Sequence, residues 1–247
     1  MSKRIRLLSL VMRSGEFERS REAAAAIEQG EIQADRKIIK DPKHSIRERA
    51  TIMWNGTEIE ARPLTCLLLN KPAGVICQKS AKERTVYDLL EQVEGIEQKT
   101  RRSLFSVGRL DRDTTGLLVI TNDGQLEHLL TEKEKQVVKT YKVTTDKPLT
   151  RPMLQQLQSG VIIRDDDRKK QFTVRAVNVK QTAERVVELG ITEGKKRQVK
   201  KMLFSVGNYV TKLERVGIGR LRLGDVTFTN GLYMIIEGPE LIKRLGI

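Results

Sequence analysis

The chain has 247 residues, enough for one large domain or for a large domain with a small appendage. Its formal net charge of +14 favours a polyanionic partner, and nucleic acid over an anionic membrane, because no apolar run approaches the roughly 18 residues of a spanning helix. Two cysteines and two histidines supply neither a disulfide framework nor a metal-ligand cluster. We therefore expect a cytoplasmic protein that binds no membrane, metal or cofactor.

Residues 1–62 predict a small domain of two helices followed by a small sheet. Apolar residues from Ile5 to Val11 open the first helix, and the second runs from Arg19 to Gln29 and ends at Gly30. Short strands are expected at Glu31–Ala34, Lys37–Ile39 and Ala50–Trp54, followed by a hairpin turn at Asn55-Gly56.

Residues 63–247 predict a second, larger domain, joined to the first by a linker at 61–66. We expect strands at Cys66–Asn70, Leu117–Ile120, Lys139–Thr145, Phe172–Val179 and Arg185–Ile191, and further strands up to Ile236. Helices are expected at Thr85–Leu90, Gly124–Leu130, Leu149–Ser159 and Lys195–Phe204, with a loop at Glu91–Thr100. This mixture predicts an α+β fold with a largely antiparallel mixed sheet flanked by helices.

The most informative run is GRLDRDTTGLLVITNDG, residues 108–124. It places Asp111 between Arg109 and Arg112, ahead of a turn signal and an apolar strand. A carboxylate with cationic neighbours favours its ionised form, which suits a nucleophile or a base. Taken alone, the run is better explained as a charged loop before a buried strand, because local ion pairs are common and weak.

Three runs resemble the motifs of pseudouridine synthases, in particular the RsuA-type branch that modifies ribosomal RNA. They are GRLD-x-x-T-x-G-LL-x-x-TNDG, the N-K-P-x-G-V that starts at Asn70, and the EGKKRQVKKML of residues 193–203. The resemblance implies an isomerase that converts a specific uridine, in ribosomal RNA for this branch, without metal or cofactor. It also implies the family's catalytic domain for residues 63–247.

The resemblance assigns three catalytic residues. Asp111 is the nucleophile or base, and Lys200, which follows R-Q-V, pairs with it. Tyr141 in K-x-Y-x-V corresponds to the family's active-site tyrosine, whose ring can stack on the target base and whose hydroxyl can move a proton. The residues alone leave ordinary alternatives open, namely a half-buried strand tyrosine and a lysine on a solvated helix face.

The basic charge is concentrated around the last of these motifs. Residues 193–222 hold nine basic side chains and only two acidic ones. Such residues bind phosphates without reading sequence, and a target uridine must also leave its stack to reach Asp111. The RNA contacts predicted in the second domain are Lys71, Arg109, Lys195, Lys196 and Arg197.

The first domain is similar to the S-four domain, named after a ribosomal protein, which RsuA-type enzymes carry at this end. The similarity rests on S-R-x-x-A-x-x-I-x-x-G-x-I, Ser20 to Ile32, although Asp35-Arg36 stands where an Asn-Gly turn is usual. It implies an RNA-binding face formed by Arg13, Arg19, Arg21, Arg36 and Lys37. A solvated helical hairpin without a ligand remains the alternative.

A rival function is a non-catalytic RNA- or ribosome-binding assembly protein. It accounts for the net charge and for the small first domain equally well. The enzyme is favoured because Asp111, Tyr141 and Lys200 all stand at motif positions. Under either interpretation we expect a monomer with structured RNA as its partner, and the sequence does not say which RNA that is.

Overall fold

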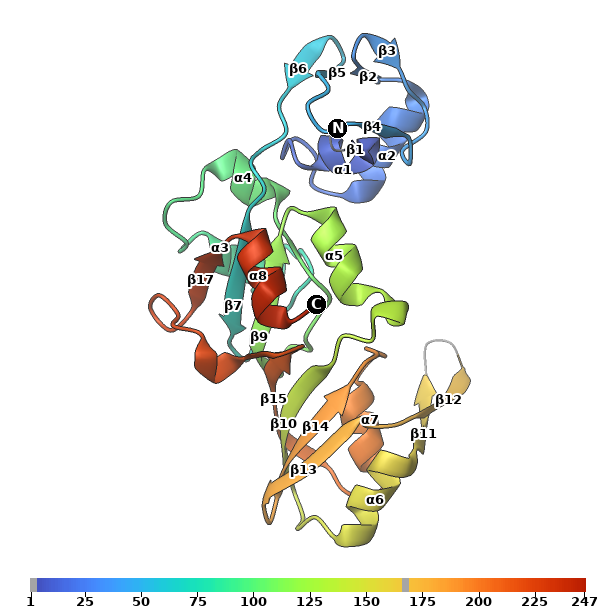
Figure 1. Ribbon diagram of the computed structural model, residues 1–247, viewed down its shortest axis with the longest axis vertical. Helices are drawn as coiled ribbons and strands as arrows, with labels where there is room; N and C mark the ends of the chain where they lie inside the picture. Colours follow the sequence, from blue (N-terminus) through green and yellow to red (C-terminus); the bar gives the residue numbers. More distant parts are fainter. Residues whose placement is uncertain (1–3, 166–168) are drawn as a thin grey trace.

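The computed structural model describes residues 4–165 and 169–247, and it forms an elongated molecule with the N-terminal unit at one end (Figure 1). That unit contains β1 (Arg4–Arg6), α1 (Leu7–Met12), α2 (Ser20–Gln29), β2 (Ile32–Ala34), β3 (Lys37–Ile38), β4 (Ser45–Arg47), β5 (Ile52–Trp54) and β6 (Thr57–Ile59). Its apolar side chains, among them Leu7, Ile27 and Ile52, form a core that is separate from those of the rest of the chain. Gly30 ends α2 in the left-handed conformation, as predicted.

Two hairpins close the four-stranded sheet of this unit, which has the order β3-β2-β5-β6. Asn55 and Gly56 both have positive φ angles, of 48° and 81°, as the tight turn between β5 and β6 requires. Asp35 and Arg36 do the same between β2 and β3, with φ angles of 48° and 65°. Asp35-Arg36 therefore makes the kind of turn that Asn-Gly usually makes.

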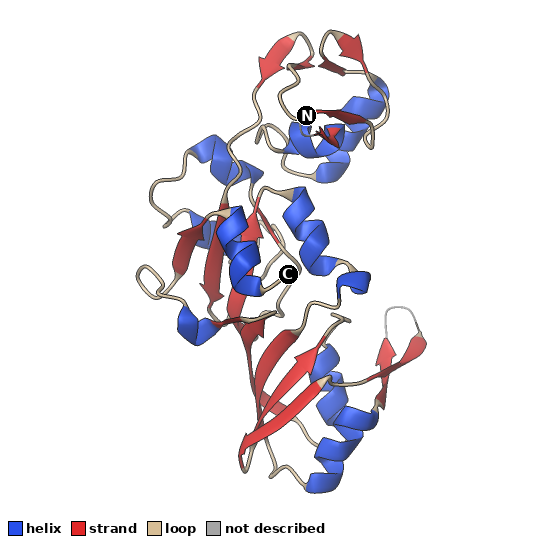
Figure 2. Ribbon diagram, in the orientation of Figure 1, coloured by secondary structure: helices blue, strands red, loops and turns tan. Residues whose placement is uncertain are grey.

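One sheet extends through the remainder of the molecule (Figure 2). It contains β7 (Cys66–Lys71), β8 (Phe105–Ser106), β9 (Thr115–Thr121), β10 (Lys139–Thr145), β13 (Asn178–Ala183), β14 (Val186–Ile191), β15 (Val210–Ile218), β16 (Leu221–Arg222) and β17 (Tyr233–Ile236). The main order is β13-β14-β10-β15-β9-β7-β17, with β16 beside β15 and β8 beside β9. Every described pairing within it is antiparallel except that of β9 with β15, which joins the two halves. The predicted α+β class is confirmed.

Helices cover both faces of the half built on β7, β9 and β17. They are α3 (Val86–Leu90), α4 (Gln98–Ser103), α5 (Gly124–Thr131) and α8 (Gly238–Leu245), with short 3₁₀ turns at Lys133–Lys135 and Leu223–Asp225. Because successive strand residues point to opposite faces, Leu67 and Leu69 pack toward α3 while Leu68 packs toward α8. No helix in residues 4–165 and 169–247 has the length and apolar character needed to cross a bilayer.

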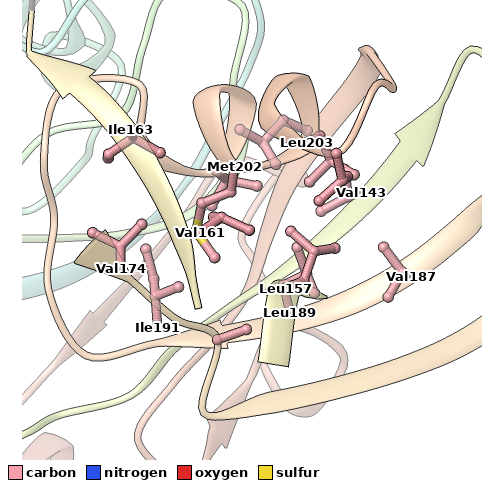
Figure 3. Close-up of a cluster of buried hydrophobic side chains, with 14 of the residues drawn as sticks. Val143, Leu157, Val161, Ile163, Val174, Val187, Leu189, Ile191, Met202 and Leu203 are labelled. Atoms are coloured by element: carbon pink, nitrogen blue, oxygen red, sulfur yellow. The ribbon is translucent and has the colours of Figure 1, made fainter. Parts of the chain in front are cut away.

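The other half packs α6 (Arg151–Ser159), α7 (Gln198–Ser205) and the hairpin of β11 (Val161–Asp165) and β12 (Lys170–Val174) on its sheet. Figure 3 shows Leu203 of α7 directed toward Val143 of β10 and Met202 directed toward Val161 of β11, in one apolar cluster. This apolar contact fixes α7 on the sheet. The polar side of the helix is left to face the loop that precedes β9.

Several local predictions were wrong or incomplete; residues 4–6, for instance, form β1, and the first helix begins only at Leu7. The loop expected at 91–100 gives way to α4 at Gln98, and the strand expected at 172–179 is two strands separated at residues 175–177. The break occurs because the N–H of Ala176 turns to bond the carbonyl of Leu157 in α6. Neither β11 nor α8 was anticipated, and α4, with the sequence QKTRRS, has no apolar periodicity from which to predict it.

Candidate active site

The N-K-P-x-G segment braces the loop that carries Asp111. The side chain of Lys71 is fully buried, and its Nζ donates hydrogen bonds to the carbonyl oxygens of Thr114 (2.9 Å), Pro72 (2.9 Å) and Arg112 (3.4 Å). The N–H of Gly74 also donates to the Arg112 carbonyl, at 2.8 Å. Burial lowers the pKa of Lys71. The prediction that Lys71 binds RNA is wrong, because its ammonium group faces backbone carbonyls and not solvent.

The Asp111 loop is held at both ends. A turn brings the N–H of Thr114 to the carbonyl of Asp111 at 3.0 Å, and the thiol of Cys77 exchanges hydrogen bonds with the backbone of Leu110 at 3.3 and 3.5 Å. Gly116 begins the parallel contact with β15 at a φ of +99°, and a Cβ there would lie 2.4 Å from the carbonyl oxygen of Arg215. Only glycine fits, which explains the G of the T-x-G motif.

A cavity of about 400 Å³ opens beside this loop. It is of the size that small-molecule sites have. Asp111 and Tyr141 both line it, and Tyr141 is half-buried in the middle of β10. The structure therefore brings to one place two residues that lie thirty positions apart and that the sequence assigned to catalysis.

The ammonium group of Lys200 is shared by two carboxylates. Its Nζ lies 3.8 Å from Oδ2 of Asp111, but only 2.5 and 2.7 Å from the two oxygens of Asp113. The hydrogen bond from Lys200 holds the pKa of Asp113 below its ordinary value. Lys200 stands next to Asp111 as the motif implied, but its tighter partner is Asp113, which the sequence analysis did not single out. The available signal was a second aspartate two residues after the first.

The two arginines that flank Asp111 in the sequence do not share one role. Arg112 forms an ion pair with Glu83 at 2.9 Å, on the exposed side of the loop. Arg109 is exposed and lines the cavity. Adjacency in the sequence therefore does not translate into an ion pair between Arg112 and Asp111, because the chain turns at Arg112 and directs its guanidinium to Glu83.

Arg215 was counted with the basic residues that bind phosphates, and for this residue the prediction is wrong. It lies opposite Tyr141 across the pairing of β10 with β15, and its side chain is buried. Its Nε donates to the carbonyl of Leu117 at 2.6 Å, while one terminal nitrogen has no partner among the described residues. Burial, together with the charge of Arg215, lowers the pKa of Lys139. The guanidinium braces the junction of β9 and β15 behind the cavity.

The rim of the cavity is basic. Lys195, Lys196 and Arg197 line it just before α7 begins. The ammonium of Lys195 lies 4.2 Å from the centre of the Phe172 ring and 3.0 Å from a Glu193 oxygen. This side chain therefore already has a cation–π contact and an ion pair within the protein. Arg197 is exposed and has a left-handed backbone, with a φ of +54°, at the start of the helix.

The basic face expected on the N-terminal unit is smaller than predicted. Arg19 and Arg21 are exposed at the start of α2, and Arg36 and Lys37 are exposed on the β2–β3 hairpin. Arg13 is buried, pairs with Glu48 at 2.8 Å and donates to the carbonyl of Arg62. Its assignment to the basic face is therefore wrong, since it supports the chain where it leaves this unit.

Residues 65–205 match the model of a family described as RNA pseudouridylate synthase. The chain belongs to this family. It is therefore an RNA-modifying isomerase, as the resemblance of its three motifs implied. In residues 4–165 and 169–247, His, Cys, Asp and Glu side chains nowhere gather in threes as a metal site would require.

Individual relatives of this pseudouridine synthase cover nearly its whole length. An uncharacterized RNA pseudouridine synthase of Bacillus subtilis is 35% identical over 96% of this chain and 97% of its own. A ribosomal small subunit pseudouridine synthase A of Vibrio cholerae is 32% identical over 90% of this chain and 91% of its own. A crystal structure of a pseudouridylate synthase superimposes with a TM-score of 0.65 at 27% identity, over 98% of this chain and 99% of that one. The similarity therefore includes the N-terminal unit.

Proposed function

We propose that this pseudouridine synthase isomerises a specific uridine of ribosomal RNA with Asp111 as its catalytic carboxylate. The observation that supports this most strongly is the cavity that Asp111 and Tyr141 line together, with the Lys200 ammonium 3.8 Å from the carboxylate. The choice of ribosomal RNA is supported by the names of relatives such as the small-subunit enzyme of Vibrio cholerae.

The reaction breaks the bond from ribose C1′ to uracil N1, turns the base and joins C1′ to C5. The proton lost at C5 is balanced by the one gained at N1, so there is no net oxidation or reduction. Asp111 either attacks the sugar or takes a proton from it, and both routes need an ionised carboxylate close to the ribose. The Lys200 ammonium lies 3.8 Å from that carboxylate, while Tyr141 offers its ring to the uracil and its hydroxyl to a moving proton.

Asp113 is a positioning residue in this scheme. Its two oxygens hold Lys200 at 2.5 and 2.7 Å, so the ammonium stays beside Asp111 before any RNA arrives. A long lysine side chain that is fixed in this way loses less conformational freedom when the substrate binds. Lys71 acts at the same loop from the interior by bonding the carbonyls of Arg112 and Thr114.

The remaining positive residues bind the RNA backbone. Arg109, Lys195, Lys196 and Arg197 surround the cavity, where they are placed to meet the phosphates next to the target uridine. Residues 1–62 form an S-four-like domain that holds a more distant part of the RNA through Arg19 and Arg21, and residues 63–247 form the catalytic domain. The enzyme acts as a monomer in the cytoplasm, where its ribosomal substrate is assembled.

Replacing Asp111 by asparagine tests the proposal. The substitution keeps the size of the side chain and removes its charge, so conversion of unmodified small-subunit RNA should fall about 10³-fold or more. The affinity for that RNA should stay within about twofold, because phosphate contacts dominate binding. Pseudouridine formation is measured by tritium release from 5-tritiated RNA, and affinity by filter binding.

An exposed carboxylate gives the matched control. Asp146→Asn removes the same charge from a residue that is exposed outside the cavity, and it should leave turnover unchanged. Turnover by Asp111→Asn close to that of the wild type would remove Asp111 from the mechanism. A wild-type protein that binds ribosomal RNA tightly but converts no uridine would favour the rival function, an assembly protein.

A further inference from the structure

An exposed aromatic pair lies beyond the catalytic cavity. Phe204 in the last turn of α7 is 62% exposed, and Tyr209 just before β15 is 54% exposed. Their ring centres are 5.6 Å apart and the rings meet edge to face, at 64°. Aromatic residues are only 4% of this chain, so two exposed rings in contact are not expected by chance.

Neither ring contributes to the apolar core that α7 builds. That core takes Val199, Met202 and Leu203 from the inner face of the helix. Leaving a phenylalanine in water forgoes the stabilisation that its burial would bring, and exposed apolar surface of this kind marks binding sites. The pair is therefore better explained by something that it binds than by the folding of the helix.

The polypeptide around Tyr209 is held rigidly. Asn208 is fully buried; its side-chain oxygen accepts from the N–H groups of Lys147 and Tyr209, and its amide donates to the Lys147 carbonyl. The carbonyl of Tyr209 in turn accepts from the N–H of Asp146 at 2.9 Å. A ring on such a support is presented to solvent in a fixed place, so little ordering is needed when it binds.

The position of the pair indicates its ligand. Phe204 follows Lys200 by four residues, so both lie on the same face of α7, about 6 Å apart along its axis. On that face Lys200 reaches the Asp111 loop, and the segment just before the helix carries Lys195, Lys196 and Arg197. Aromatic rings beside a basic rim are the combination that binds unpaired nucleotides, the rings by stacking and the cations by their charge.

We propose that Phe204 and Tyr209 form a stacking platform for an unpaired base of the substrate RNA, next to the uridine that enters the cavity. This rests on the proposed function in its choice of RNA and deepens it by naming a contact outside the cavity. A base on the platform would hold the strand open beside the extruded uridine. It would also add affinity that does not depend on phosphate charge.

The test compares strands that differ only in their bases. Two labelled twelve-nucleotide RNAs are used, oligo(A) and a fully abasic strand of the same length and charge, together with unmodified small-subunit RNA. The wild type should bind oligo(A) more tightly than the abasic strand, by about 5- to 150-fold for each stacked base. Phe204→Ala with Tyr209→Ala should reduce that preference by about fivefold or more and leave the affinity for the abasic strand and its salt dependence unchanged.

Further variants separate stacking from mere apolarity and from folding. Phe204→Trp should retain the preference, Phe204→Leu should lose most of it, and Ile235→Ala, an exposed apolar residue of β17, should keep it. Because both rings are exposed, the double variant should melt close to the wild type. Its turnover at saturating small-subunit RNA should be nearly unchanged, while its KM for that RNA rises.

Three outcomes would overturn the platform. In the first, the double variant binds oligo(A) as the wild type does. In the second, it loses affinity for both strands equally, which would reduce the surface to a structural or charge role. In the third, light scattering finds a wild-type dimer that the double variant dissociates, which would make the pair a protein interface. If the wild type converts no small-subunit RNA, but the double variant still loses the preference for oligo(A), only the proposed function is contradicted.

Discussion

Replacing Lys71 by methionine separates the two roles that this residue has been given. Methionine is similar in length and carries no charge, so the buried carbonyls of Pro72 and Thr114 lose the Lys71 donor, while the carbonyl of Arg112 keeps the N–H of Gly74. A buried polar group left unpaired costs about 1–3 kcal/mol. The bond to Arg112 is long, and the variant no longer has to bury an ammonium, which offsets part of the loss.

The net loss should be about 2–4 kcal/mol of unfolding free energy, or roughly 5–12 °C in melting temperature for a chain of this size. Turnover should fall more than KM rises, because the carbonyls released belong to the loop that places Asp111. The assays are urea denaturation, steady-state kinetics and RNA affinity as a function of salt. Lys142→Met, at an exposed position on β10, is the control for loss of a positive charge.

The salt dependence decides between the two roles. A lysine that contacts a phosphate would lower the slope of log affinity against log salt by about 1 when removed. If Lys71 only supports the loop from the interior, Lys71→Met should leave this slope unchanged. A Lys71→Met protein as stable as the wild type but with a reduced slope would refute the assignment made from the structure.

Two further predictions concern Lys200 and Cys66. Lys200→Met should reduce turnover about 10²-fold or more, because the Lys200 ammonium lies beside Asp111. Lys196→Met should chiefly raise KM and lower the slope of log affinity against log salt. Equal losses of turnover in the two variants would make Lys200 an ordinary phosphate contact. Burial raises the pKa of the Cys66 thiol from 9.0 to about 12, so the folded state favours the neutral thiol. Its contribution to stability is complete below pH 9 and is lost as the pH rises toward 12, by up to about 1.4 kcal/mol per pH unit. The unfolding free energy of Cys66→Ala should therefore fall less steeply than that of the wild type between pH 9 and 11, and parallel curves would contradict this.

The sequence by itself determined the local form of the Asp111 loop and the type of fold. The run GRLD-x-x-T-x-G specifies a turn and a buried strand in consecutive residues, so its form can be read locally, and Gly116 has the φ of +99° that no other residue adopts easily. The strand that carries Tyr141 was predicted in the same way from its alternation, whereas the choice of Tyr141 itself came from the family resemblance. In the N-terminal unit, Gly30 marked the end of α2 and Asn55-Gly56 marked the turn between β5 and β6.

Only the tertiary structure decided which charges are buried. Lys71, Arg13 and Arg215 have the same side chains as the residues proposed to bind phosphates, and in the sequence they lie among them, yet all three are buried. Their partners are backbone carbonyls and one glutamate, contributed by segments far away in the chain. Every residue has a backbone carbonyl, whatever its side chain. The sequence therefore does not indicate which carbonyl will accept a hydrogen bond from a buried cation.

The same reason applies to the ion pair at the centre of the site. The motif placed Lys200 beside Asp111, but Asp113 holds it more closely, because α7 is positioned by Met202 and Leu203 on the sheet and not by the loop itself. A sequence names the residues that can take part in such a pair. The distance between them is set by the packing of whole elements, which depends on every side chain between the helix and the sheet at once.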